Sequence, residues 1–136
     1  MQFNPYLNFN GQCKEAFTFY EQCLGGKIVA MSTHEEMPAG QDVPAEWKDL
    51  IMHARLQVGD AVLMGSDSPP EHFKEAQGIY VSLQVDDPLD AERIFQAFEE
   101  GGTVQMPIQE TFWAARFGMV SDRFGTPWMI NCEKAA

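Results

Sequence analysis

Hydrophobic residues follow two different periods along the first half of the chain. Between Phe3 and Phe9, apolar and polar residues alternate, which is the pattern of a half-buried strand. From Gln12 onward the apolar spacing becomes helical, and Gly25 and Gly26 end the helix. The segment 34–49 has no clear period, so we expect a long loop with one helical turn near 45–49. Strands are predicted over residues 3–9, 27–33, 50–58 and 61–65, with a hairpin turn at Gly59 and Asp60.

The same order of patterns returns in the second half. An alternating strand over 79–85 leads to Asp86 or Asp87, either of which can cap a helix that Pro88 opens. The helix stops at Gly101 and Gly102, and its apolar stripe consists of Ala91, Ile94, Phe95 and Phe98. Further strands are predicted over 103–108, 116–120 and 127–132, the last two joined by a tight turn over 121–126.

The two halves are an internal repeat. Ile79 follows Phe3 and Gly101 follows Gly25 at the same distance, since 79 minus 3 and 101 minus 25 both give 76. Strand, helix and double glycine recur in one register, so each half has the order β-α-β-β-β. We predict an α+β fold in a single domain over residues 1–136. Module one covers about 1–67, a polar connector covers 68–77, and module two covers about 78–136.

Composition and charge narrow the classes of function. The chain of 136 residues is 45% hydrophobic and 21% charged, which fits a globular domain with a core of its own. Its formal net charge of −11 argues against nucleic acid or a membrane surface as a partner. Three cysteines without a CxxC pair, no basic leader and no apolar run of transmembrane length favour a cytoplasmic location.

Three stretches carry a resemblance to a known superfamily. They are YLNFNGQCKEAFTFYEQCLGG near the start, IMHARLQVGDAVLMGSD in the middle and FWAARFGMVSDRFGTPWMIN near the end. They cover well over half of the chain. They resemble the vicinal oxygen chelate superfamily of glyoxalases, bleomycin-resistance proteins and dioxygenases, and most closely its PhnB-like family. The resemblance implies two curved four-stranded sheets that form an open cup with the helices outside, and it implies a homodimer.

The resemblance also implies where a metal ion would be held. Metalloenzymes of this superfamily carry His or Glu ligands on the first and last strands of each half. The corresponding positions here are Met64, Tyr80 and Met129, with Asn4 or Pro5 on the first strand. Because thioethers favour soft ions and proline offers no donor, we expect no metal and no cofactor at these positions. His34 and His72 lie in polar connectors without ligand spacing, so we interpret them as solvated loop residues.

Strand parity sorts the side chains between a helix-facing side and a cup-facing side. We expect the helix-facing set to be Leu7, Phe9, Leu63, Val81, Leu83, Val85, Trp128 and Ile130. We expect the cup-facing set to be Asn4, Tyr6, Asn8, His53, Arg55, Gln57, Met64, Tyr80, Ser82, Gln84, Met129 and Asn131. The second set mixes polar groups with soft apolar ones, which is typical of a small-molecule pocket.

Two residues on one face of the strand over 50–58 are candidates for chemistry. His53 could act as a general acid or base, or it could be a hydrogen-bonded structural histidine. Arg55 could hold a carboxylate or phosphonate through two N–H groups, or it could pair with one of the chain's acidic residues.

Five further residues are candidate ligand contacts. Met64 and Met129 could line the cup for an apolar ligand, or they could fill it. Tyr80 could hydrogen-bond a ligand or simply pack. Trp113 could stack on an aromatic ligand with Arg116 as the anion anchor, unless both residues serve a dimer contact.

These observations favour a metal-free, cytoplasmic homodimer that binds a small, partly apolar molecule. One alternative is a lyase or dioxygenase-type enzyme of the same superfamily, with a non-standard metal or with His53 as its acid/base. Another is a protein whose cup is filled and whose role lies in protein contacts. The sequence leaves open the identity of the ligand and whether any reaction is catalysed.

Overall fold

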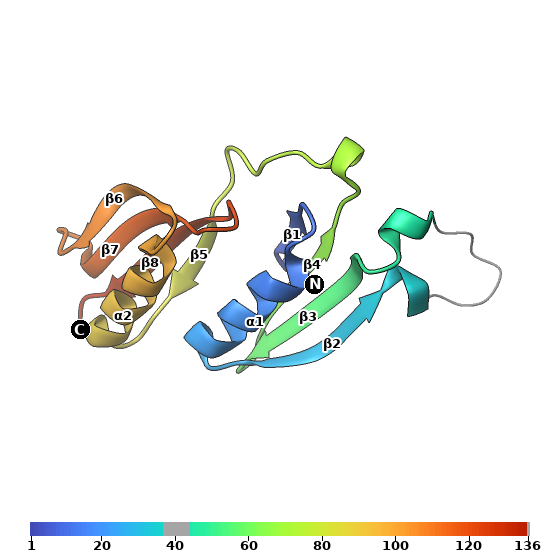
Figure 1. The fold of residues 1–136 in the computed structure, drawn as a ribbon. Coiled ribbons are helices and arrows are strands. Elements are labelled where there is room, and N and C mark those ends of the chain that lie inside the picture. Colours follow the sequence, from blue (N-terminus) through green and yellow to red (C-terminus); the bar gives the residue numbers. More distant parts are fainter. Residues whose placement is uncertain (37–43, 136) are drawn as a thin grey trace. The chain divides into compact units, whose positions relative to one another are not determined.

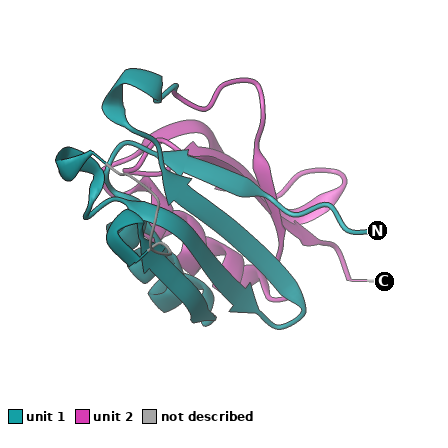
Figure 2. Ribbon diagram, turned by 90° about the vertical axis from the view of Figure 1, so that its right-hand side faces the viewer, with its two compact units in different colours: residues 1–74 teal, residues 75–136 magenta. Residues whose placement is uncertain are grey.

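The chain forms two compact units that share one architecture. The computed structural model describes residues 1–36 and 44–135. One unit spans Met1–Lys74 and the other Glu75–Ala136 (Figure 2). The division between them falls inside the connector predicted over 68–77. Each unit is a four-stranded sheet with one helix on one of its faces (Figure 1).

The first unit follows the predicted order of elements. Its sheet has the strand order β1-β4-β3-β2, in which β1 runs parallel to β4 and the other pairs are antiparallel. Short 3-10 turns lie outside the sheet, and one of them, Ala45–Trp47, falls in the helical turn predicted near 45–49. Residues 37–43 of the predicted loop lie outside the described residues. The elements are β1 Tyr6–Phe9, α1 Cys13–Leu24, β2 Lys27–Thr33, β3 Ile51–Val58 and β4 Ala61–Asp67.

The second unit repeats this topology. Its sheet has the order β5-β8-β7-β6, again with the first strand parallel to the last strand of the unit. The elements are β5 Val81–Gln84, α2 Pro88–Glu99, β6 Thr103–Gln109, β7 Ala114–Ser121 and β8 Pro127–Glu133. The predicted fold class is therefore confirmed as α+β, with two tandem βαβββ modules and two open, mixed four-stranded sheets.

Both first strands are shorter than their alternating patterns predicted. The expected strand over 3–9 begins at Tyr6, and the expected strand over 79–85 begins at Val81. Pro5 has no N–H group to donate to a ladder, although its carbonyl oxygen accepts from the N–H of Met64. Phe3 is 93% exposed and Ile79 is 75% exposed, so neither of these two apolar residues contributes to a core.

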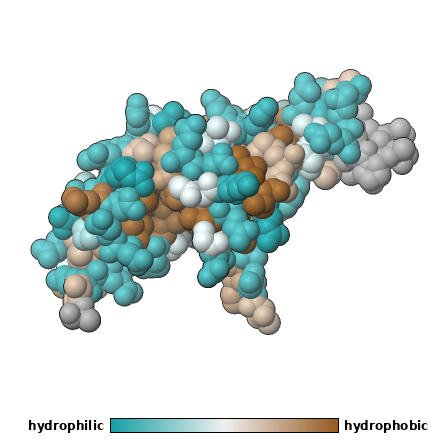
Figure 3. All heavy atoms as spheres, turned by 90° about the horizontal axis from the view of Figure 1, so that it is seen from below, coloured by the Kyte–Doolittle hydropathy of each residue, from teal (hydrophilic) through white to brown (hydrophobic). Residues whose placement is uncertain are grey.

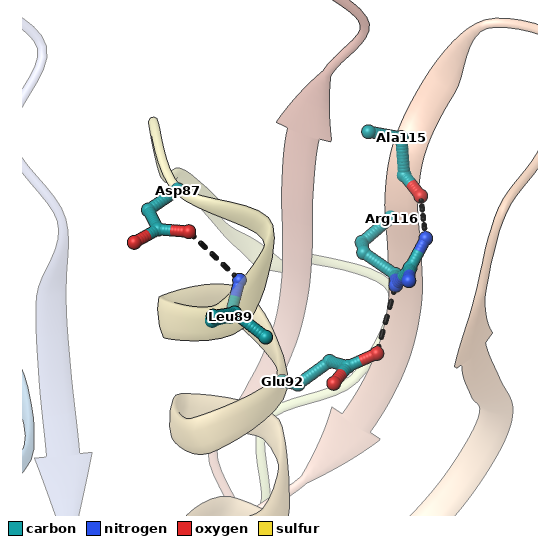
Figure 4. Close-up of polar contacts among 5 residues, drawn as sticks. All are labelled: Asp87, Leu89, Glu92, Ala115 and Arg116. Carbon is teal, nitrogen blue, oxygen red and sulfur yellow. Dashed lines mark hydrogen bonds and ion pairs between the residues drawn. The ribbon is translucent and has the colours of Figure 1, made fainter.

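The helices begin and end close to the predicted residues. The carboxylate of Asp87 accepts a hydrogen bond of 3.0 Å from the N–H of Leu89 (Figure 4). Pro88 is the first helical residue. The apolar stripe predicted on this helix is confirmed, because all four of its residues are buried. Helix α1 ends at Gly25, whose φ of 73° lies in the left-handed region.

An aromatic ring over a glycine makes the contact between helix and sheet in each unit. A Cβ atom added at Gly65 would lie 2.8 Å from Phe17 Cε1, and one added at Gly118 would lie 2.6 Å from Phe95 Cε2. Both rings are fully buried. The remaining core is apolar on both sides of this contact, and it includes Phe9, Ala16, Tyr20, Ala54, Leu56, Leu63, Ile94, Phe98, Val120, Trp128 and Ile130.

The predicted helix-facing residues divide into two groups. Phe9, Leu63, Trp128 and Ile130 are buried, as expected. The remaining four, Leu7, Val81, Leu83 and Val85, are only half-buried. These four belong to the short parallel strands β1 and β5 or follow them, so they lie at one edge of each sheet.

The contact between Gly65 and Phe17 predicts a cost for adding one methyl group. In Gly65→Ala, the new Cβ would also lie 2.9 Å from the carbonyl oxygen of Leu7, so backbone or helix must shift. We expect the free energy of unfolding in urea to fall by about 1–3 kcal/mol. The matched control is Ser66→Ala, which removes a hydroxyl from the opposite face and should change stability by less than about 0.5 kcal/mol. Equal stability of Gly65→Ala and the wild type would contradict this packing.

Candidate functional site

Each sheet has one face that its own helix leaves uncovered, which we call the helix-free face. Residues paired across a ladder point to the same side, so the register assigns the members of each face. On the first sheet they are Tyr6, Asn8, Lys27, Ala30, Ser32, His53, Arg55, Gln57, Val62, Met64 and Ser66. On the second sheet they are Ser82, Gln84, Thr103, Met106, Gln109, Phe117, Met119, Ser121, Pro127, Met129 and Asn131.

His53 on β3 lies beside a tyrosine from β1. The Tyr6 hydroxyl and His53 Nδ1 are 3.3 Å apart, and which of them donates depends on the tautomer of the imidazole. The two rings are tilted, with centroids 5.9 Å apart. Within residues 1–36 and 44–135, Nε2 of His53 has no hydrogen-bond partner. The pair therefore fixes one nitrogen of the ring and leaves the other available for a proton or a ligand.

Arg55 lies two residues further along the same face. Its neighbours across the ladder are Ala30 on β2 and Met64 on β4, and neither side chain can accept a hydrogen bond from a guanidinium as a carboxylate does. Arg55 is exposed, and it forms no ion pair within the described parts of the chain. The alternative in which Arg55 pairs with an acidic residue is thus not seen in those parts. The structure brings together three predicted site residues, His53, Arg55 and Met64, on this face.

The second helix-free face is more apolar. Met129 pairs with Met119 across the ladder, and it pairs with Ser82 on the other side. Phe117 lies beside this pair, and its ring centroid is 5.5 Å from that of Trp113. Trp113, which is 47% exposed, therefore joins the edge of a face lined by methionine and aromatic rings.

Arg116 lies on the opposite side of β7 from Phe117. Its Nε donates a hydrogen bond of 2.8 Å to Glu92 Oε1 on α2, and another guanidinium N–H donates to the Ala115 carbonyl (Figure 4). The hydrogen bond to Glu92 raises the pKa of Arg116 above its ordinary value. This ion pair separates Arg116 from the aromatic contact of Trp113, and its role as an anion anchor stays a prediction.

Tyr80 and the candidate positions on the first strand lie outside the ladders. Tyr80 precedes β5 and is half-buried, while Asn4 and Pro5 precede β1. Of the positions that the superfamily resemblance singles out, only Met64 and Met129 are therefore strand residues. They are equivalent in the repeat, because each pairs with a residue of the parallel edge strand of its own sheet, Tyr6 or Ser82.

Sequence reasoning missed two buried carboxylates. Asp67, which is 5% exposed, accepts 2.9 Å hydrogen bonds from the N–H groups of Cys13 and Ile51. It thereby joins the start of α1 to β3. Burial, and secondarily this carboxylate, raise the pKa of the Cys13 thiol, so Cys13 is a packed thiol and not a nucleophile. The two residues that donate to Asp67 lie 54 and 16 residues away from it in the sequence, so no local sequence pattern predicts these hydrogen bonds.

Asp122 does more than the turn predicted for it. One carboxylate oxygen accepts from the N–H groups of Phe124 and Thr126, at 2.9 and 3.0 Å. The other accepts from the indole N–H of Trp128 at 2.8 Å. Asp122 is 3% exposed. With these donors satisfied inside the protein, Asp122 acts as an internal brace of the β7–β8 hairpin.

The donors present do not fit a metal ion of the superfamily type. Within residues 1–36 and 44–135, no group of three or more His, Cys, Asp or Glu residues is placed to hold a metal. Met64 and Met129 offer thioethers, which are poor ligands for hard divalent ions.

No helix of the described chain is long and apolar enough to cross a membrane.

Comparisons with known proteins agree on one superfamily. A sequence profile of the glyoxalase/bleomycin resistance protein/dioxygenase superfamily matches residues 2–130. Protein YjdN of Escherichia coli (strain K12) is 34% identical over 142 residues, which cover 98% of this chain and 97% of YjdN. The crystal structure of protein PA1353 from Pseudomonas aeruginosa is 52% identical with a TM-score of 0.90, and the match covers 99% of both chains.

A more distant structure shares the fold alone. The PhnB protein from Bacillus cereus, also named as a 3-demethylubiquinone-9 3-methyltransferase, is 20% identical with a TM-score of 0.79. The match covers 97% of this chain and 99% of that protein. At this identity the likeness carries the architecture and not the methyl transfer in its name.

The donor chemistry predicts that purified protein carries no stoichiometric divalent metal. Protein isolated without chelator should contain far less than one zinc, nickel, manganese or iron per chain when measured by inductively coupled plasma mass spectrometry. Treatment with EDTA should leave the melting temperature unchanged, because no folded metal site is lost. One equivalent of a divalent metal, or a lower melting temperature after EDTA, would contradict the prediction.

Proposed function

The chain belongs to the glyoxalase/bleomycin resistance protein/dioxygenase superfamily, as a YjdN/PhnB-like member, and from this premise we propose that it binds a small, partly apolar molecule without a metal ion. The binding surface in this proposal is the helix-free face of the first sheet. The helix-free face of the second sheet offers a further apolar surface. Ligand sites of this kind combine mostly apolar walls with a few fixed polar groups.

One observation carries the proposal. The first helix-free face places a soft apolar side chain, Met64, directly beside Arg55 and opposite Tyr6, whose hydroxyl contacts His53. Three polar groups that can orient a ligand thus surround a methionine that can adapt to its shape. The fold does not need this combination, because the side chains that hold α1 to the sheet are all on the other face.

The absence of a metal in this proposal rests on ligand chemistry. A metalloenzyme of this superfamily would need His or Glu at the positions of Met64 and Met129. A methionine at a ligand position forfeits the charge and the hard donor that such a metal requires. With methionine at both positions, we expect a ligand to be held by van der Waals contacts and hydrogen bonds and not by a metal ion.

Acid/base catalysis by His53 is the second candidate. The contact between Tyr6 and Nδ1 of His53 favours it, because it holds the ring while Nε2 has no partner among the described residues, and a general acid or base needs such an arrangement. The fate of the bound molecule distinguishes binding alone from catalysis by His53. A binding protein releases the molecule unchanged, whereas an enzyme converts it.

Methionine methyl resonances test the proposed surface. We expect benzyl alcohol, used as a neutral probe, to shift the Met64 methyl signal of protein labelled with ¹³C at its methionine methyls. Met1, which is fully exposed, serves as the internal control and should not shift. Shifts of Met1 alone, or no saturable shift of Met64, would contradict binding at this face. Recovery of altered small molecules after incubation with a cell extract would favour the enzymatic alternative.

A homodimer is the second part of the proposal. Each sheet ends in two edge strands, and Val29 on β2 and Val104 on β6 are 48% and 38% exposed there. Hydrophobic residues also lie among hydrophilic ones on the face shown in Figure 3. These edges and exposed side chains could be covered by a second copy.

Light scattering tests the dimer. The chain has a mass of 15.3 kDa, so multi-angle light scattering should return twice this value for a homodimer. Asp or Lys at Val29 should shift the distribution toward the monomer if β2 is part of the interface. A monomer at all protein concentrations would contradict the proposal.

A further inference from the structure

We propose that the helix-free face of the first sheet binds a small organic oxyanion, a carboxylate or a phosphonate, with Arg55 as its anchor. This inference rests on the proposed function and adds the chemical class of the ligand to it. Arg55 is suited to the role because a guanidinium donates two parallel N–H groups to a pair of oxygens.

The surroundings of Arg55 leave its charge uncompensated. Its cross-strand neighbours are Ala30 and Met64, and its neighbours along the same face of β3 are His53 and Gln57. None of these four is acidic, and the amide of Gln57 donates to the carbonyl of Gly59.

Arg93 and Arg116, unlike Arg55, are ion-paired, and they show how the fold neutralises an arginine side chain. Arg93 lies 2.9 Å from Asp90 within α2, and Arg116 lies 2.8 Å from Glu92. Arg55, in the parts of the chain that the structure describes, has no such carboxylate.

The charge of the whole face supports an anionic ligand. The chain has 20 acidic and 9 basic residues, so an arbitrary surface would be expected to carry carboxylates. No strand residue that the register assigns to this face is acidic. Lys27 on β2 adds a second cation to the same face. It pairs with Gln57, which lies two residues along β3 from Arg55. The face is therefore a local positive region on an acidic protein, which complements an anion.

The internal repeat shows that the fold does not require an arginine here. In the first sheet Arg55 pairs with Met64, which pairs in turn with Tyr6 on the parallel edge strand. In the second sheet Met119 pairs with Met129, which pairs with Ser82. Met119 thus occupies in the second unit the place of Arg55 in the first. An apolar side chain satisfies the architecture at this position, so the charge of Arg55 serves something other than folding.

The rest of the face suits an oxyanion that carries an apolar group. His53 lies two residues along β3 from Arg55, and the hydroxyl of Tyr6 on β1 contacts its ring, so both supply further polar contacts. Met64, beside Arg55, can cover the apolar part of the same molecule.

Matched aromatic probes test the inference on the full chain. Benzoate and phenylphosphonate carry the two oxyanions on the same ring, and benzamide is the neutral counterpart of benzoate. We expect both anions to shift backbone amide signals of β3 and β4 around Arg55, and to bind more weakly as salt rises. Arg55→Met, which copies the second unit, should weaken the binding of both anions by about tenfold or more, as loss of a charged hydrogen bond implies. It should weaken the binding of neutral benzamide much less than the binding of either anion.

Two further variants make the result specific. Arg93→Met removes the same charge from α2, where Arg93 is paired with Asp90, and should leave anion binding as in the wild type. Arg55→Lys keeps the charge but loses the two parallel donors, so it should bind both anions with an affinity between those of wild type and Arg55→Met. Unchanged thermal unfolding of Arg55→Met, which the methionine in the second unit leads us to expect, shows that the variant is folded.

The possible outcomes are distinct. A preference for one anion over the other in the wild type, lost in Arg55→Met, supports the inference and identifies the oxyanion. Equal anion binding by wild type and Arg55→Met overturns it. Binding of benzamide as tight as that of benzoate at this face also overturns it, while the proposed small-molecule binding survives. If neither anion nor benzamide perturbs the face, both the inference and the proposed binding surface are wrong.

Discussion

The close contact between a helix ring and a strand glycine determines the layout of both units. Phe17 over Gly65 and Phe95 over Gly118 leave no room for a side chain at either glycine position. Side chains along a strand alternate between the two faces of a sheet. The face on which the glycine lies therefore determines the face of all remaining residues of the sheet. Residues on the helix-free face do not pack against the helix of their own unit, and His53, Arg55 and Met64 lie on this face of the first sheet.

Much of this layout could be predicted from local patterns. The stripe that includes Phe95, the cap at Asp87 and the double glycines depend on residues close together in sequence, where periodicity and backbone preference act. The repeat then supplied the topology, because two copies of an uncertain pattern reinforce each other. The ends of strands were less predictable. Whether Phe3 or Ile79 joins a ladder depends on a partner strand that the local sequence does not contain.

The candidate site shows the same limit. Parity placed His53, Arg55 and Met64 on one face, because all three lie on strands of regular alternation. It could not foresee the contact between Tyr6 and His53, whose partners are 47 residues apart. The sequence predicts Arg116 beside Trp113 as an anion anchor, but it does not predict the hydrogen bond from Arg116 to Glu92, a carboxylate on α2. Contacts of this kind depend on tertiary packing, which periodicity does not encode.

The parallel pairing at the edge of each sheet has a consequence for how the chain acquires its structure. Tyr6 pairs with Met64 and Val81 pairs with Trp128. The first strand of each unit can therefore join its sheet only after the last strand of that unit is present. The entropy of closing such a long loop is lost before this pairing stabilises anything, which makes it a late and cooperative event. During synthesis, β1 leaves the ribosome unpaired until β4 has followed it. Each βαβββ module is therefore expected to reach its final form as a whole, and the surface that includes Tyr6 and His53 is created in that last step.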